Sequence, residues 1–277
     1  MQKSSKNQLR LIGGQPILKV ISASRRIDMV GCYPDELVQI LETRCPPERV
    51  HSLVIWTKNV ANLLDYEPLR RRVLMYDQIY VHYTITGMGG SALESRVPPM
   101  EETLKRLPEV IELVGSPRRV QFRFDPIVHL RMPGGKTYTN LPIFKELAPA
   151  ISQLGIEIVT TSWVALYRKV VNRLKRAGFV PLEISQQQWQ AELDELLTTA
   201  QRYNLRIHGC CVPGLPRSRC IDGELLNKLH PKGYLCSTKR AKGQRELCGC
   251  TESWDIGWYN PCLHGCLYCY GNPWEGE

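Results

Sequence analysis

Three cysteines near the end of the chain have the spacing of a metal- or cluster-binding site. Cys262, Cys266 and Cys269 form a CxxxCxxC pattern within NPCLHGCLYCYG, residues 260–271. Three thiolates are one fewer than a closed tetrahedral site requires. Either a fourth ligand comes from elsewhere in the chain, or the bound group keeps an open coordination position.

Zinc and an iron–sulfur cluster are the two alternatives for this trio. His264 or Cys250 could complete a zinc site, but structural zinc prefers two separated pairs, and only one residue separates Cys248 from Cys250. Iron–sulfur clusters accept more varied spacing. A [4Fe–4S] cluster held by three cysteines leaves one iron free to bind a substrate or cofactor.

The distribution of the cysteines supports a ligand role. The chain has 11, and nine of them follow residue 208. The sequence shows neither a secretory signal nor a long apolar span, so we expect a cytoplasmic protein with no membrane partner. Thiols stay reduced there, and clustered cysteines indicate metal binding or catalysis. Cys32 and Cys45, far from the others, are predicted to be ordinary half-buried thiols.

The first 208 residues alternate between β-rich runs and amphipathic helices, which predicts an α/β domain with a parallel sheet. The sheet could be open and doubly wound, or curved into a full or partial barrel. Residues 209–277 are rich in Cys, Gly and Pro and are predicted to be a tail that ligation holds in place. The predicted strands are 17–24, 52–57, 78–86, 120–128, 156–162 and 204–209. Helices are predicted at 34–42, at 98–114 with a bend at Pro108, at 144–154, at 163–178, and after a capping box at Ser185 and Gln188.

Polar residues follow several predicted strands. SRRID (residues 24–28), TGMGG (86–90), RFDP (123–126) and TTSW (160–163) stand at equivalent positions. In parallel α/β folds, chemistry collects at the carboxyl ends of the strands. These residues therefore predict a site at that edge, and glycines there would let a ligand approach the backbone.

The trio, with Tyr268 directly before its last cysteine, resembles the cluster motif of the radical S-adenosylmethionine (SAM) superfamily. The resemblance implies a (β/α)6-type partial TIM barrel and a [4Fe–4S] cluster whose free iron chelates the amino and carboxyl groups of SAM. It also implies reductive cleavage of SAM to an adenosyl radical, which abstracts hydrogen from a substrate. The reductant would be a protein such as flavodoxin or ferredoxin. The substrate stays open.

In most of that superfamily the motif follows the first strand, whereas here it ends the chain. This arrangement resembles an uncharacterised bacterial domain family with a C-terminal CxxxCxxC motif. The shared features are ISASRR at 21–26 followed by Asp28, RFDP at 123–126, CID at 220–222, CGC at 248–250, and SxDIGxYNxCxxGCxYCY at 253–270. Ile27 and Met29-Val30 depart from the expected pattern. The spore photoproduct lyase branch is a more distant resemblance.

The resemblance implies roles for residues at the strand ends. Arg25, Arg26 and Arg123 would bind the carboxylate of SAM or a substrate phosphate. Asp28 and Asp125 would orient those arginines or accept hydrogen bonds from SAM. The alternative is that the Arg and Asp side chains simply pair across neighbouring strands. The cofactor-binding candidates are Tyr268, Gly89, Gly90 and Glu94, the last for the amine of SAM.

The other cysteines of the tail favour a second site, which would hold a second iron–sulfur cluster. The predicted ligands are Cys220, Cys248 and Cys250, with Cys210 or Cys211 as the fourth. The alternative is unligated thiols in a loop.

Charge leaves a second class of function open. The net charge is +9 and the isoelectric point about 9.0, which permits a nucleic-acid or phosphate-bearing partner. The alternative function is thus a non-catalytic iron–sulfur or zinc protein that binds nucleic acid through its basic surface. Only the radical SAM hypothesis requires the trio to fold back over the strand ends, near Ser24 and Arg25.

Overall fold

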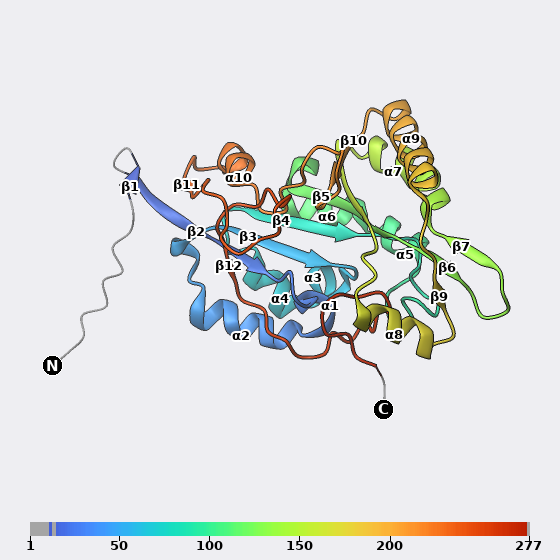
Figure 1. Ribbon diagram of the computed structural model, residues 1–277. Coiled ribbons are helices and arrows are strands. Elements are labelled where there is room, and N and C mark those ends of the chain that lie inside the picture. Colours follow the sequence, from blue (N-terminus) through green and yellow to red (C-terminus); the bar gives the residue numbers. More distant parts are fainter. Residues whose placement is uncertain (1–10, 13–14, 276–277) are drawn as a thin grey trace.

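A curled parallel sheet forms a half-barrel. The computed structural model describes residues 11–12 and 15–275. All six predicted strands are present, and each pairs in parallel with the next in chain order (Figure 1). These strands are β2 (Gln15–Ala23), β3 (Val50–Thr57), β4 (Ile79–Thr84), β5 (Val120–Ile127), β8 (Ile158–Trp163) and β10 (Arg206–Gly209).

The strands are nearly continuous apolar runs because both faces of the sheet are covered. In β3, seven of eight residues are buried. Residues such as Leu53, Val81 and Phe122 face the helices, whereas Val54 and Tyr80 face the concave side and pack against the tail. This two-sided burial is typical of parallel sheets.

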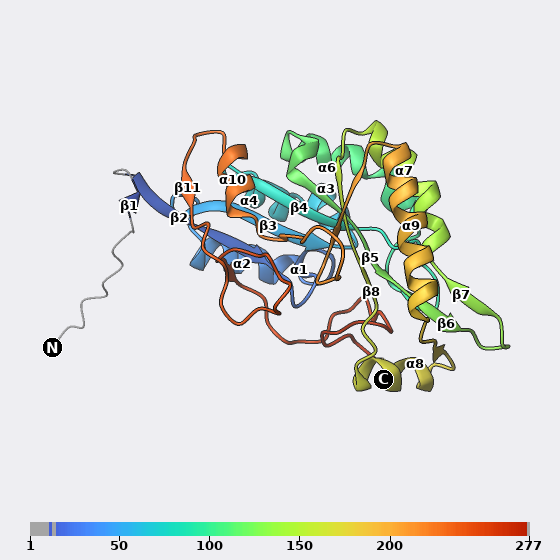
Figure 2. The ribbon, with the colours of Figure 1, turned by 45° about the horizontal axis from the view of Figure 1, so that its top comes forward.

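Most of the helices lie on the convex face (Figures 1 and 2), whereas α10 (Gly223–Leu229) packs with Val54 and Tyr80 on the concave side. The longer ones are α2 (Pro34–Arg44), α4 (Glu67–Val73), α6 (Leu107–Val114), α7 (Phe144–Gln153), α8 (Arg168–Arg176) and α9 (Gln186–Arg202). Short segments are α1 (Met29–Cys32), α3 (Ala61–Asp65), α5 (Met100–Lys105), α10 (Gly223–Leu229) and the 3-10 turns η1 (Pro47–Arg49), η2 (Pro117–Arg119) and η3 (Leu141–Ile143).

Two predicted helices need comment. The helix predicted over 98–114 is divided into two helices, α5 and α6. Pro108 lies in the first turn of α6, where a backbone N–H would have no helical partner and its absence costs nothing. The helix over 163–178 was predicted too long, because α8 begins only at Arg168. Trp163 pairs with Ile127 of β5, and the Ala165 amide donates to the Tyr270 hydroxyl at 2.6 Å, so tertiary contacts keep this segment extended.

A small second sheet was not predicted. It consists of β6 (His129–Arg131), β7 (Thr137–Thr139) and β9 (Val180–Pro181), paired in the order β7-β6-β9. Its strands have two or three residues each, too few to show an alternating pattern.

The tail crosses the open side of the half-barrel and returns to the first strand. After β10 it forms α10, and then β11 (Leu235–Cys236) and β12 (Trp254–Asp255) pair in parallel with β2. β1 (Leu11–Ile12) also pairs with β2, in antiparallel orientation. Figure 1 shows the orange and red tail running from β10 back to β2. The tail therefore lies beside the first strand of the half-barrel.

Candidate functional site

The cysteine trio packs on the segment that follows β2. His264, which lies between the first two cysteines of the trio, contacts the Asp28 carboxylate at 2.8 Å. Gly271 lets the end of the trio pack closely on this segment, because a Cβ there would lie 3.2 Å from the Arg26 carbonyl oxygen and 3.4 Å from the Cys269 sulfur. The trio thus lies beyond the carboxyl end of the first strand, as the sequence predicted.

Asp28 connects this loop to the barrel. Its carboxylate accepts from the Gly31 amide at 2.8 Å, which caps α1, and from the Lys58 amide at 2.8 Å. It also lies 2.8 Å from Nε2 of His264, which stands between the first two cysteines of the trio. Burial opposes the charged forms, yet the ion pair lowers the pKa of Asp28 and raises that of His264 to about 9. Asp28 therefore orients the trio loop and not an arginine, which corrects one predicted role.

Lys58 brings a buried positive charge to the trio. Its ammonium group donates to Glu94 at 2.8 Å and lies 5.7 Å from the centre of the Tyr268 ring. Burial works against the charge, but Glu94 and the Cys266 thiol raise the pKa of Lys58. Sequence reasoning missed Lys58, although it directly follows the second strand and so had the same positional signal as the other strand-end residues.

Glu94, Gly89 and Gly90 lie on one loop beside the trio. The Glu94 carboxylate is engaged by Lys58 and by the Thr86 hydroxyl at 2.9 Å. A Cβ on Gly89 would lie 2.0 Å from the Pro98 carbonyl oxygen, and Gly90 has a left-handed φ of 76°. Both glycines thus serve the packing of this loop on itself, and their predicted role in cofactor binding remains a prediction.

Cys32 is a fourth thiol at the trio. Its sulfur lies 3.8 Å from that of Cys262. The predicted description of Cys32 as an ordinary half-buried thiol is incomplete, because the fold brings residue 262 next to it. Contact with Cys32 outweighs burial and lowers the pKa of Cys262 to about 6, while the same contact raises the pKa of Cys32. Cys262 is thereby the thiol of this pair that ionises first.

The three thiols of the trio are ligands that suit an iron–sulfur cluster. The Leu267 amide donates to the Leu93 carbonyl, and the Cys269 sulfur accepts from the Gly271 amide at 3.2 Å. The buried Tyr268 hydroxyl has no hydrogen-bond partner among the described residues. In that part of the chain no three Cys, His, Asp or Glu side chains are already arranged around one point for a metal ion. Binding would therefore require these thiols to turn toward a common centre.

Arg25 and Arg26 pair with a carboxylate of the tail. Arg25 Nε lies 3.6 Å and Arg26 Nε 4.0 Å from Asp255. Asp255 also accepts from the Ser22 and Ser24 hydroxyls at 2.8 and 2.7 Å. The sequence predicted Asp28 and Asp125 as the partners of these arginines; Asp255 takes that position because β12 pairs with β2.

Arg123 and Asp125 form an ion pair on the concave face of β5. Asp125 also accepts from the Ser162 hydroxyl, and Arg123 Nη1 lies 3.2 Å from the Cys220 sulfur. The carboxylate of Asp125 is close enough to Lys58 and to Tyr270 to shift both pKa values upward. This pair therefore lies between the trio and the other tail cysteines.

The predicted second cysteine set also comes together. Cys220, Cys248 and Cys250 pack in one cluster of side chains, and the thiols of Cys210 and Cys220 shift each other's pKa. Cys211, the alternative fourth member, lies near Cys210, Cys220 and Cys248.

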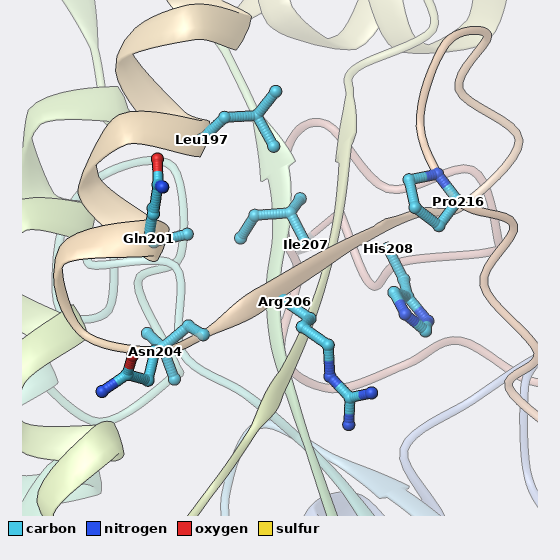
Figure 3. A pocket seen from close by; sticks show the side chains of 9 residues that line it. Leu197, Gln201, Asn204, Arg206, Ile207, His208 and Pro216 are labelled. Carbon is cyan, nitrogen blue, oxygen red and sulfur yellow. The ribbon is translucent and has the colours of Figure 1, made fainter.

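A surface hollow lies elsewhere, along the free edge of β10. Figure 3 shows its lining, which includes Leu197, Ile207, His208 and Pro216. None of the lining residues is a cysteine or a predicted site residue. This hollow therefore plays no part in the candidate site.

Fold and site together define an α/β half-barrel whose cysteine-bearing tail returns to the first strand. The chain belongs to the family described as Domain of unknown function (DUF1848), whose model matches residues 34–271. The expected membership of an uncharacterised domain family is thus confirmed. A search of the curated proteins finds no match. Among the described residues, no helix is both long and apolar enough to cross a membrane.

Proposed function

We propose that this protein is a radical SAM-type enzyme with a (β/α)6-type barrel and a [4Fe–4S] cluster bound by Cys262, Cys266 and Cys269. The observation that carries the proposal is the return of the tail, which brings the trio to the carboxyl end of β2. When bound, the cluster would supply the electron that cleaves SAM. Radical chemistry must be kept from water, and a strand-end site inside a barrel provides that protection.

The residues around the trio support binding of a charged cofactor. Lys58 supplies a buried cation beside Cys266, and Arg25 and Arg26 hold further positive charge at the end of β2. The Arg123–Asp125 pair offers both a donor and an acceptor on the concave face. Such groups suit the amino and carboxyl groups of SAM, or a substrate phosphate.

Anaerobic purification and reconstitution test the cluster. We expect brown protein with iron and sulfide, and an electron paramagnetic resonance signal of the reduced protein that changes when SAM is added. The variant Cys262→Ala/Cys266→Ala/Cys269→Ala should lose this SAM-dependent change. Cys45→Ser is the matched control, since Cys45 is buried at the C-terminal end of α2, near Lys19 and Arg72. A colourless protein holding one zinc ion and no iron would rule the proposal out.

A further inference from the structure

We propose that Cys210, Cys220, Cys248 and Cys250 form a second, closed metal centre inside the half-barrel. Its four thiolates would take a thiophilic metal, either as a zinc ion or as an iron–sulfur cluster. This proposal does not depend on the function of the trio, because none of the four sulfurs belongs to it.

The four thiols come from three segments of the chain. Cys220, Cys248 and Cys250 pack in one cluster of side chains, and the thiols of Cys210 and Cys220 are near enough to shift each other's pKa. In a tetrahedral zinc centre the sulfurs are about 3.8 Å apart, because each Zn–S bond is about 2.3 Å. Among the described residues no three of these side chains are already arranged around one point, so binding requires the thiols to turn toward a common centre.

The backbone holds each segment in place without help from the sulfurs. The Cys210 amide donates to the Thr161 carbonyl at 2.8 Å, and the Thr251 amide donates to the Ile221 carbonyl at 2.9 Å. His82 Nε2 lies 2.6 Å from the Cys220 carbonyl oxygen. A Cβ on Gly249 would lie 2.9 Å from the Arg219 side chain, so the close approach of the CGC segment depends on glycine. The convergence of the sulfurs is therefore a property of the fold.

Two guanidinium groups face the cluster of thiols. Arg123 Nη1 lies 3.2 Å from the Cys220 sulfur, and Arg245 Nη2 lies 3.6 Å from the Cys210 sulfur. Arg123 is buried, and Asp125 supplies a single compensating charge. A neutral thiol is a weak acceptor for a buried guanidinium, whereas a metal-bound thiolate is a strong one. The charges thus suit a set of metal thiolates.

The structure also selects the members of the set. The Arg245 guanidinium donates to the sulfur of Cys210 and not to that of Cys211, and the Cys236 thiol lies 3.7 Å from the Gly223 carbonyl oxygen. We therefore assign neither of them to the centre.

Metal analysis of a protein without the trio tests this centre. In Cys262→Ala/Cys266→Ala/Cys269→Ala, purified anaerobically, we expect about one centre per chain: either about one zinc, or about four iron with sulfide and visible absorption. Adding Cys220→Ser and Cys250→Ser should remove it, whereas adding Cys211→Ser should not. Zinc and iron–sulfur results both support the site and identify its metal.

A cobalt titration tests the site even if the metal is lost during purification or if the serine variants fold poorly. The trio-free protein is stripped with a chelator, checked by circular dichroism and titrated with Co²⁺. We expect cobalt–thiolate absorption that saturates at about one equivalent, with protection of four thiols from alkylation. A folded trio-free protein with neither metal nor cobalt–thiolate absorption would overturn the proposal. That result would leave iron binding at the trio in intact protein unaffected, so the two proposals fail separately.

Discussion

Lys58 forms a largely buried ion pair with Glu94. The exposed fraction of its side chain is 17%, and that of its partner Glu94 is 1%. A buried ion pair adds little net stability, but removal of one partner leaves an uncompensated charge and costs about 3–5 kcal/mol. The pair thus fixes a cation beside Cys266, where a thiolate cluster would carry negative charge.

Lys58→Met should therefore lower the free energy of unfolding by about 3 kcal/mol. The double variant Lys58→Met/Glu94→Gln should recover most of that loss, because Glu94 no longer carries a buried charge. Urea unfolding of anaerobically purified protein measures both. Lys145→Met is the control, since the Lys145–Glu195 pair is exposed and should contribute less than about 1 kcal/mol. Equal losses at Lys58 and Lys145 would contradict this account.

His51 makes the docking of the tail sensitive to pH. It is fully buried, its ring lies 2.9 Å from the Tyr234 carbonyl oxygen, and burial lowers its pKa to about 4. The adjacent His230 ring, tilted by 42° and 4.4 Å away, also has a lowered pKa, again chiefly because of burial. In the unfolded chain a histidine takes up its proton near pH 6.5, so the folded state loses stability as the pH falls from about 6.5 toward 4.

At about pH 5, His51 alone should cost the folded state about 2 kcal/mol relative to pH 7. His51→Gln keeps an amide donor near Tyr234 and does not titrate. Between pH 7 and pH 5 the unfolding free energy of this variant should therefore fall by about 2 kcal/mol less than that of the native protein. Urea unfolding at both pH values decides the matter. An unchanged pH dependence in the variant would show that His51 is not the group responsible.

At the scale of elements, β12 attaches the tail to β2. Asp255 accepts hydrogen bonds from the Ser22 and Ser24 hydroxyls and from the Arg25 amide, and both serines are buried. The backbone at Gly257 packs so closely on Ser24 that a Cβ there would lie 1.9 Å from the Ser24 hydroxyl oxygen. The trio begins five residues after Gly257, so its position depends on this attachment.

Asp255→Ala should reduce stability by about 2–4 kcal/mol, because it leaves buried serine hydroxyls without acceptors. It should also lower the iron content per chain and make the tail easier to cleave by protease. Glu246→Ala is the matched control, an exposed carboxylate in the same tail. If the two variants retain iron equally and resist cleavage equally, β12 does not position the trio.

Much of the fold could be predicted from the sequence, because the six strands are long apolar runs with turn residues between them. The pairing of the tail with β2 could not, since β11 and β12 have two residues each and depend on contacts distant in sequence. The same limit applies to the site. Strand-end position identified Asp28, Arg123 and Asp125, but the partnership of Arg25 with Asp255 and of Cys32 with Cys262 exists only once the tail has returned.

At the scale of the whole molecule, the tail carries the cysteine trio back to the first strand of the half-barrel. The trio is last in sequence, yet it lies beside the segment that follows the first strand of the half-barrel. The concave face then contains two groups of thiols, with the Arg123–Asp125 pair between them. The two proposals made above, a radical SAM-type enzyme and a second metal centre, both require these thiol groups to lie on the concave face.

Formation of 5′-deoxyadenosine tests the central claim most directly. Reconstituted protein is incubated with SAM and dithionite under anaerobic conditions, and the product is measured per chain by mass spectrometry. We predict 5′-deoxyadenosine with the native protein and with Cys45→Ser, and none with Cys262→Ala/Cys266→Ala/Cys269→Ala. Native protein that carries a full [4Fe–4S] cluster but forms no more 5′-deoxyadenosine than the triple variant would contradict the account.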